Sequence, residues 1–128
     1  MRLLLDSHAF LWWLDGDPKL TVRARTSIAA DPALVAVSAA TAWEIATKAR
    51  IGKLPDAVDV AADVAGCIAR EGFQSLAVMV EHGQRAGALP GPLHDPFDRM
   101  LIAQAMLENL HLVSIERTFD VYGVARLW

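Results

Sequence analysis

The stretch LLLDSHAF, residues 3–10, begins with three leucines and then turns abruptly polar. A short leucine run is typical of a buried strand, and Asp6 stands at its inner end, followed by Ser7 and His8. A carboxylate in that position is costly to desolvate unless hydrogen-bond donors or a cation meet it. We therefore expect Asp6 to belong to a polar site at the end of the first strand.

The rest of the chain alternates short apolar runs with helical patterns. We expect strands at residues 2–6, 34–38, 73–78, 111–114 and 124–128, and helices at 8–14, 21–30, 40–52, 57–70, 80–88 and 96–109. This alternation predicts an α/β protein with a central, mainly parallel sheet and helices on both faces. In such sheets, functional sites gather beyond the carboxyl ends of the strands.

The composition predicts a single domain over residues 1–128. Hydrophobic residues make up 54% of the chain and charged residues 21%, which argues against disorder and against a membrane-spanning helix. The single cysteine, Cys67, excludes an internal disulfide, and the apolar run after Arg2 is too short for a secretory signal, so we expect a soluble cytoplasmic protein. The net charge of −3 gives no general attraction for a polyanion, so nucleic-acid binding would need a local basic patch or bound cations.

Four acidic residues lie where predicted strands pass into the following helices or loops, and a parallel sheet directs all four to one edge: Asp6, Glu44, Asp98 and Glu116. If these carboxylates converge, their repulsion raises their pKa values unless a hard cation such as Mg²⁺ or Mn²⁺ lies among them. The histidines show no HExxH spacing and the chain has no CxxC motif, so a zinc site is not expected. The sequence also contains no P-loop, GxGxxG or GxSxG motif.

Three of these acids also have an ordinary structural explanation. Thr41 and Glu44 match the spacing of a capping box at the start of a helix. Asp95 and Pro96 predict a capped helix whose first turn contains Asp98, where a carboxylate favours the helix dipole. Glu116 suits a solvated turn.

Carboxylates that hold divalent ions can promote in-line hydrolysis of a phosphodiester, because the ions activate water and stabilise the pentacoordinate phosphate. Basic residues near the predicted acids are candidates for binding the flanking phosphates: Lys48, Arg50, Lys53 and Arg99. Lys48 and Arg50 would equally suit a solvated helix face.

Four segments together resemble the PIN-domain ribonucleases, specifically the VapC toxins of type II toxin–antitoxin systems: LLLDSHAFLWW (3–13), SAATAWEIATKARIGKL (38–54), HDPFDRMLIAQA (94–105) and HLVSIERTFDVYGV (111–124). The resemblance covers nearly the whole chain, in the right order. It implies a three-layer α/β/α PIN-like fold and a Mg²⁺-dependent endoribonuclease that acts on RNA. It also implies a homodimer and a cognate antitoxin that blocks the active site.

The resemblance assigns catalytic and metal-binding roles to the four acids. Asp6, Glu44 and Asp98 match the family's acidic positions, and Asp6 and Asp98 are expected to ligate Mg²⁺ most closely. Glu116 stands where the family usually has an aspartate. Ser7 stands where threonine is commoner and keeps the hydroxyl, which makes it a further candidate for contact with the substrate.

Two alternatives stay open on the sequence alone. A phosphatase of the haloacid-dehalogenase type also begins with an aspartate at a strand end, but it needs a second aspartate two residues later, where this chain has His8. A non-catalytic PIN-like interaction module would use the acids as helix caps and the apolar helices as a partner surface. Trp12 and Trp13 are about 100° apart on a helix, so they cannot both face one core, and we expect one of them in a dimer or antitoxin interface.

Overall fold

The centre of the computed structural model, which describes all 128 residues, is a five-stranded sheet in the order β3-β2-β1-β4-β5. The strands are β1 (Leu3–Leu5), β2 (Val35–Ser38), β3 (Gln74–Leu76), β4 (His111–Val113) and β5 (Arg126–Leu127). Every pairing is parallel, with Leu3 opposite Val35 on one side and His111 on the other. The predicted α/β class and parallel sheet are therefore confirmed.

The leucines of β1 join two hydrophobic cores, one on each face of the sheet. Side chains alternate between the faces of a strand, so Leu3 and Leu5 pack into one core with Phe10, while Leu4 packs into the other with Phe119. All three leucines are at most 2% exposed. Burying each contributes about 1.5–3 kcal/mol, which explains why a three-residue strand can hold the centre of the sheet.

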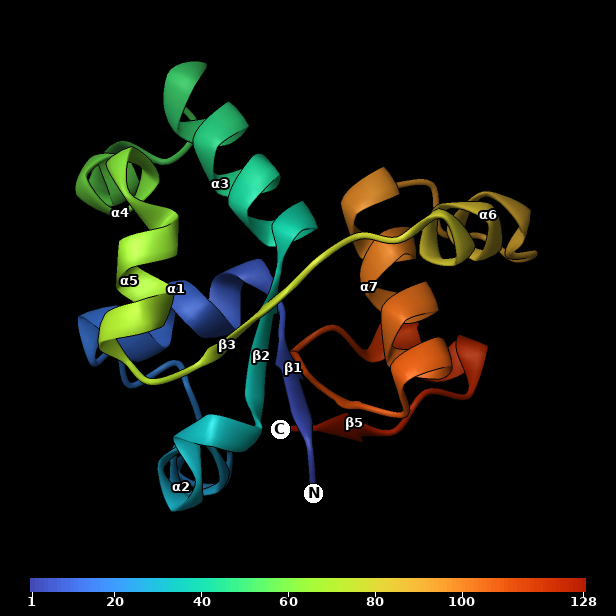
Figure 1. Cartoon of the computed structure of the whole chain (residues 1–128), viewed down its shortest axis with the longest axis horizontal. Coiled ribbons are helices and arrows are strands. Elements are labelled where there is room, and N and C mark those ends of the chain that lie inside the picture. Colours follow the sequence, from blue (N-terminus) through green and yellow to red (C-terminus); the bar gives the residue numbers. More distant parts are fainter.

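Helices cover both faces and give a three-layer α/β/α architecture (Figure 1). One side carries α1 (Ser7–Asp15), α2 (Val22–Ala30), α4 (Val58–Ala62) and α5 (Val64–Arg70), and the other carries α6 (Val80–Ala88) and α7 (Pro96–Glu108). Helix α3 (Ala39–Arg50) continues directly from β2. Single 3-10 turns occur at Pro32–Leu34 and Pro55–Ala57, and a longer one covers Arg117–Tyr122.

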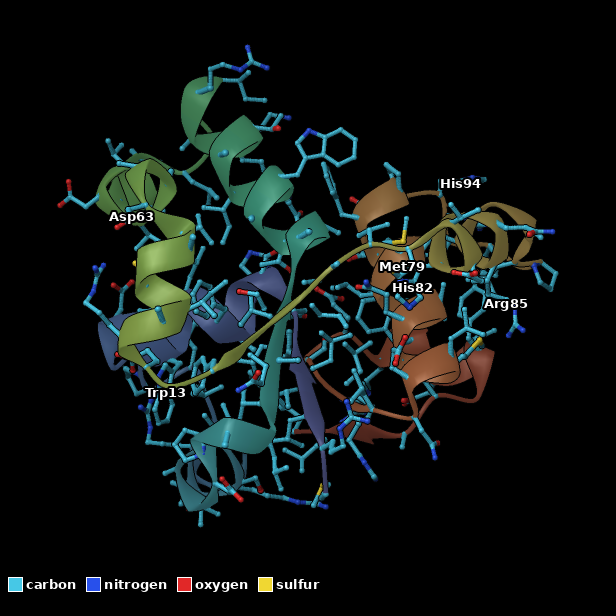
Figure 2. The ribbon with its side chains drawn as sticks, viewed as in Figure 1. Trp13, Asp63, Met79, His82, Arg85 and His94 are labelled. Carbon is cyan, nitrogen blue, oxygen red and sulfur yellow. The ribbon has the colours of Figure 1, made fainter.

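Two predicted helices differ in detail from the structure. The helix predicted over 57–70 is interrupted at Asp63, whose side chain accepts a hydrogen bond from the Gly66 N–H and so begins a new helix, α5 (Figure 2). The predicted capping box of Thr41 and Glu44 is wrong, because the N-cap of α3 is Ser38. The Thr41 hydroxyl is buried without a hydrogen-bond partner, and Glu44 lies beyond the first turn.

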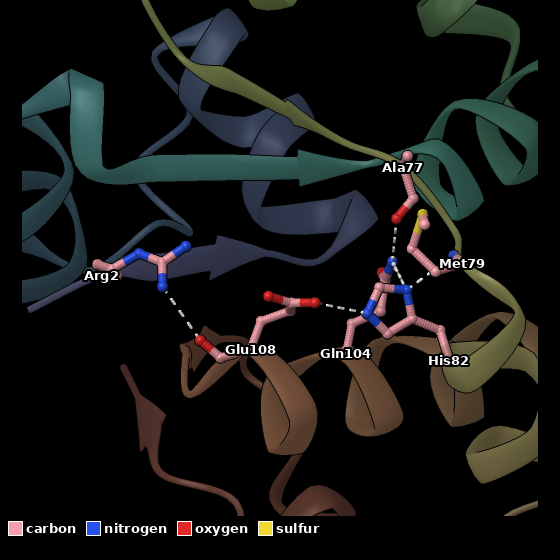
Figure 3. A network of polar contacts seen from close by, with 6 residues as sticks. All are labelled: Arg2, Ala77, Met79, His82, Gln104 and Glu108. Atoms are coloured by element: carbon pink, nitrogen blue, oxygen red, sulfur yellow. Dashed lines mark hydrogen bonds and ion pairs between the residues drawn. The ribbon is translucent and has the colours of Figure 1, made fainter.

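A buried histidine fixes α6 against α7 (Figure 3). The Nδ1 atom of His82 accepts a hydrogen bond from the Met79 N–H, at 2.9 Å, so the ring proton lies on Nε2, which donates to Glu108 Oε1 at 2.9 Å. The amide of Gln104 donates to the Ala77 carbonyl at 3.1 Å. These contacts tie the start of α6 and the segment before it to the C-terminal half of α7.

Arg99 makes a second tie between the same helices. Its guanidinium donates to the Ala86 carbonyl at 3.0 Å and to the Leu93 carbonyl at 2.7 Å, and it also reaches the carbonyls of Gly87 and Leu89. The Tyr122 hydroxyl supports the same loop by accepting from the Leu93 N–H at 3.1 Å. Arg99 therefore holds the end of α6 and the 89–95 loop in position before α7.

We expect Arg99→Met to lower the free energy of unfolding by about 2–4 kcal/mol, because it removes a charged donor and leaves several backbone carbonyls without a partner. Urea denaturation measures this loss. Arg85→Met is the matched control, since Arg85 is exposed and its side chain makes only one weak hydrogen bond, to the Met106 sulfur at 3.9 Å. Equal stabilities of the two variants would contradict the structural role of Arg99.

Candidate functional site

The predicted acids meet in one pocket at the carboxyl edge of the sheet. It has a volume of about 200 Å³ and no hydrophobic residue in its lining, which consists of Asp6, Ser7, His8, Glu44, Lys48, Asp95, Asp98 and Glu116. These residues come from the β1–α1 junction, from α3, from the start of α7 and from the loop after β4. Residues far apart in the sequence are thus brought together as the parallel arrangement predicts.

Asp6 is held by hydrogen-bond donors at the end of β1. It is 5% exposed, and its Oδ1 accepts from the Ala9 N–H at 2.8 Å, which makes Asp6 the N-cap of α1. Burial raises the pKa of Asp6, although hydrogen bonds from the Ser114 hydroxyl and the Ala9 N–H, and the nearby His8, act in the opposite direction. The donors therefore compensate only part of the cost of burying this carboxylate.

Both carboxylate oxygens of Glu44 already have protein donors. The Ser7 hydroxyl donates to Oε1, and the Lys48 ammonium lies 2.6 Å from Oε2, one helical turn further along α3. Glu44 is buried, so this arrangement fixes the direction in which its carboxylate points. Ser7 and Lys48 thus act first as partners of Glu44.

Asp98 lies in the first turn of α7, beside the residue that caps that helix. The N-cap is Asp95, as predicted, and its Oδ1 accepts from the N–H groups of Phe97 and Asp98 at 2.8 and 3.0 Å. Burial is the largest cause that raises the pKa of Asp98 to about 7, and the charges of Asp95, Glu44, Asp6 and Glu116 contribute to the same rise in that order. The fourth acid, Glu116, is exposed at the rim.

The predicted basic residues divide into two groups. Lys48 lines the acid pocket, whereas Arg50 is exposed beyond it and Lys53 lines a separate cavity of about 270 Å³. The donors of Arg99 are taken up by backbone carbonyls, so its placement gives no support to the prediction that it contacts the substrate. Sequence reasoning did not place His8 and Asp95 in the pocket lining, although Asp95 lies only three residues before Asp98.

The two cavities meet at His8, which lines both. The second cavity also contains Trp12, whose ring lies 5.4 Å from His8 and 5.8 Å from Trp128 between centroids. Trp13 points elsewhere and packs on Phe73 at 5.9 Å. Both tryptophans nevertheless pack, partly buried, against the same core as Phe10, so the expectation that they cannot both face one core is wrong. An indole ring is large enough to reach the core from the edge of a helix face.

The donor set of the acid pocket fits a hard divalent cation held by few direct protein ligands. Carboxylate and hydroxyl oxygens are the ligands that Mg²⁺ prefers, and Mg²⁺ usually takes one or two carboxylates and completes its shell with water. The structure contains no cluster of three or more Asp, Glu, His or Cys side chains already placed to hold a metal ion. Burial first, and then the neighbouring acids, raise the pKa of Asp98 to about 7, and a bound cation would relieve the part that comes from the acids.

Comparisons with known proteins agree with this architecture. Three structurally similar chains are a VapBC complex from Rickettsia felis bound to a promoter DNA fragment, VapC20 of Mycobacterium tuberculosis, described as a sarcin-ricin loop cleaving toxin, and a toxin–antitoxin complex from Klebsiella pneumoniae. The TM-scores are 0.71, 0.68 and 0.61, with 15%, 16% and 18% sequence identity. The alignments cover 100%, 98% and 89% of this chain and 98%, 98% and 86% of the others.

At these identities the similarity concerns the fold. No curated protein sequence matches the chain significantly. A sequence profile of the PIN domain, however, matches residues 3–124, a range that contains every acid of the pocket. The chain therefore belongs to the PIN-domain family.

Proposed function

We propose that this chain is a Mg²⁺- or Mn²⁺-dependent endoribonuclease of the VapC type, the toxin of a type II toxin–antitoxin module, with residues 1–128 as one PIN domain. The observation that carries this proposal is the convergence of Asp6, Glu44, Asp98 and Glu116 on one pocket. The fold relatives support it, since they include a toxin described as cleaving the sarcin-ricin loop, which is an RNA.

Asp6 and Asp98 would hold the divalent ion, with Glu44 and Glu116 beside it. When bound, such an ion supplies a Lewis acid for the phosphate and a water of lowered pKa. The chain's own residues then have distinct tasks. Ser7 keeps the Glu44 carboxylate in one orientation, and Lys48 offers an ammonium to a phosphate oxygen. Arg99 is not part of the proposed set, because its donors hold the 89–95 loop.

A cognate antitoxin is the protein partner that we propose, because two of the fold relatives are toxin–antitoxin complexes. Binding over the acid pocket would exclude RNA from it. No helix of the chain is long and apolar enough to cross a membrane, and we propose a cytoplasmic site of action, where RNA is present.

We also propose a homodimer. The Trp43 patch, an apolar hollow of about 320 Å³, is lined by Ala39, Ala40, Trp43, Val78, Pro96, Phe97 and Met100. Trp43 is 64% exposed and stands edge-on to Phe97 at 4.9 Å between centroids, while Val80, next to this patch in the chain, is 82% exposed. Exposed apolar surface of this kind typically marks a protein interface.

Asp6→Asn should lower RNA cleavage by about a hundredfold or more, because it removes a carboxylate that would hold the divalent ion, and the ion stabilises the transition state. The fold should survive, since asparagine also caps helices well and can still accept from the Ala9 N–H. Gel analysis of cleaved RNA with purified protein measures the rate. Asp59→Asn, the same change at an exposed acid of α4, is the control and should cleave normally. Undiminished cleavage by Asp6→Asn would refute the proposed role of Asp6.

The stability of the metal-free protein should fall as the pH rises from about 4 to about 7. The folded-state pKa of Asp98 is about 7 against an ordinary value of 3.8, so the folded state binds more protons than the unfolded state in this window. Asp98→Asn should flatten this slope.

Mg²⁺ should raise the Tm of the wild type at pH 7 by mass action, and much less so in Asp98→Asn. A wild-type Tm that does not respond to Mg²⁺ or Mn²⁺ would favour a non-catalytic interaction module.

Val80→Asp should weaken the proposed dimer, because it places a charge beside the apolar Trp43 patch. Sedimentation velocity at several protein concentrations measures the proportion of dimer. Val121→Asp is the matched control, since Val121 is 69% exposed and lies outside the patch. A wild-type protein that stays monomeric throughout, or a variant that dimerises like the wild type, would place the interface elsewhere or exclude it.

A further inference from the structure

Lys48 and Glu44 form an ion pair unlike those on ordinary helix surfaces. The side chain of Glu44 is 9% exposed and that of Lys48 is 32% exposed, and the ammonium lies 2.6 Å from Glu44 Oε2. An ion pair of this spacing on an exposed helix stabilises the helix by only a few tenths of a kcal/mol. Here one partner is buried and lines the acid pocket, where water screens the charges less.

Lys48 is the only lysine or arginine among the residues that line this pocket, and it faces five carboxylates. His8 is the other basic residue of the lining, and it lies two residues after Asp6 in the chain. Besides Glu44, the charges of Asp95 and Asp98 act on the Lys48 ammonium. Lys48 is therefore the main positive charge that keeps the acids together when no metal is bound.

A divalent ion and this ammonium compete for the same carboxylates. Two cations held a few ångströms apart in a pocket of about 200 Å³ repel strongly. The Lys48 ammonium lies against Oε2 of Glu44, so an ion or its water shell near this oxygen would meet the repulsion of that ammonium. Ser7 occupies the other oxygen, so the Glu44 carboxylate keeps its anchor during this exchange.

The lysine side chain is suited to leave. Its four-carbon stem is flexible, and the ammonium is a compact charge that water solvates well. With about a third of the side chain exposed, Lys48 can rotate into solvent without opening a packed core.

We propose that Lys48 is the resident counter-cation of the acid pocket, which a divalent ion must displace in order to bind. This inference rests on the proposed metal-dependent function and adds to it a control of metal binding at the same site. Lys48 stabilises the metal-free fold and at the same time weakens metal binding, so it sets the divalent-ion concentration at which the pocket fills.

Direct Mn²⁺ binding to the full chain tests this proposal without RNA turnover, because the electron paramagnetic resonance signal of free Mn²⁺ reports the unbound ion. Lys48→Met keeps the aliphatic stem and removes the charge. It should lower the Kd for Mn²⁺ by about tenfold and lower the Tm of the metal-free protein. Lys48→Gln, a second neutral variant, should change both values in the same direction, and Lys48→Arg should stay near the wild type.

Arg50→Met is the matched control. It removes the same charge from the same helix, but Arg50 is exposed and does not line the pocket, so its Kd for Mn²⁺ should stay within about twofold of the wild type. An equal gain in affinity in Arg50→Met would mean that net charge, and not displacement of Lys48, controls binding.

The other outcomes separate this inference from the proposed function. If the wild type binds Mn²⁺ and both neutral variants bind it equally or more weakly, Lys48 instead orients Glu44 for the metal, and the inference is overturned while the nuclease proposal stands. If neither the wild type nor any variant binds Mn²⁺, both proposals fail.

Discussion

Repulsion among five carboxylates around one small pocket is the constraint on which the rest of this structure depends. No hydrophobic residue lines the pocket, and the chain supplies one ammonium and one imidazole against five acids. Burial, and after it the repulsion of the neighbouring acids, raises the pKa of Asp98 to about 7, which expresses the cost of this arrangement. Such a site persists only if packing elsewhere in the domain outweighs its instability, and a site that opposes folding in this way is typical of function rather than of stability.

The necessary packing comes from elements that end in the pocket. β1 buries its three leucines in two separate cores, so Asp6 at its end cannot move without disturbing both. Asp98 is held differently, because α7 is fixed to α6 by Arg99 near its start and by the His82 contacts further along (Figure 3). The His82 network is made of hydrogen bonds between well-matched groups, whereas the acid pocket consists of like charges. One helix therefore carries a stable polar network on its C-terminal half and a strained acidic group at its start.

Much of this arrangement could be predicted because it depends on local pattern. The leucine run ending in Asp6, the cap at Asp95 and the bounds of α6 all follow from residues close together in the sequence. The errors arose where tertiary context decides. Ser38, and not Thr41, caps α3, since β2 runs directly into that helix and leaves no room for a later start. The direction of the Arg99 guanidinium could not be predicted either, because its four carbonyl partners belong to another helix and a loop.

The two partners of Glu44 illustrate how a pocket of this kind can be both preorganised and responsive. The Ser7 hydroxyl belongs to α1 and is buried, so its contact with Oε1 is a fixed part of the wall. The Lys48 ammonium reaches Oε2 on a flexible stem from α3, the helix that also carries Glu44. Moving this ammonium away from Glu44 costs little packing. A hydroxyl group carries no charge and does not compete with a metal ion, whereas an ammonium group is charged and competes with it. A carboxylate with one neutral, fixed donor and one charged, mobile donor can therefore exchange its counter-cation while keeping its orientation.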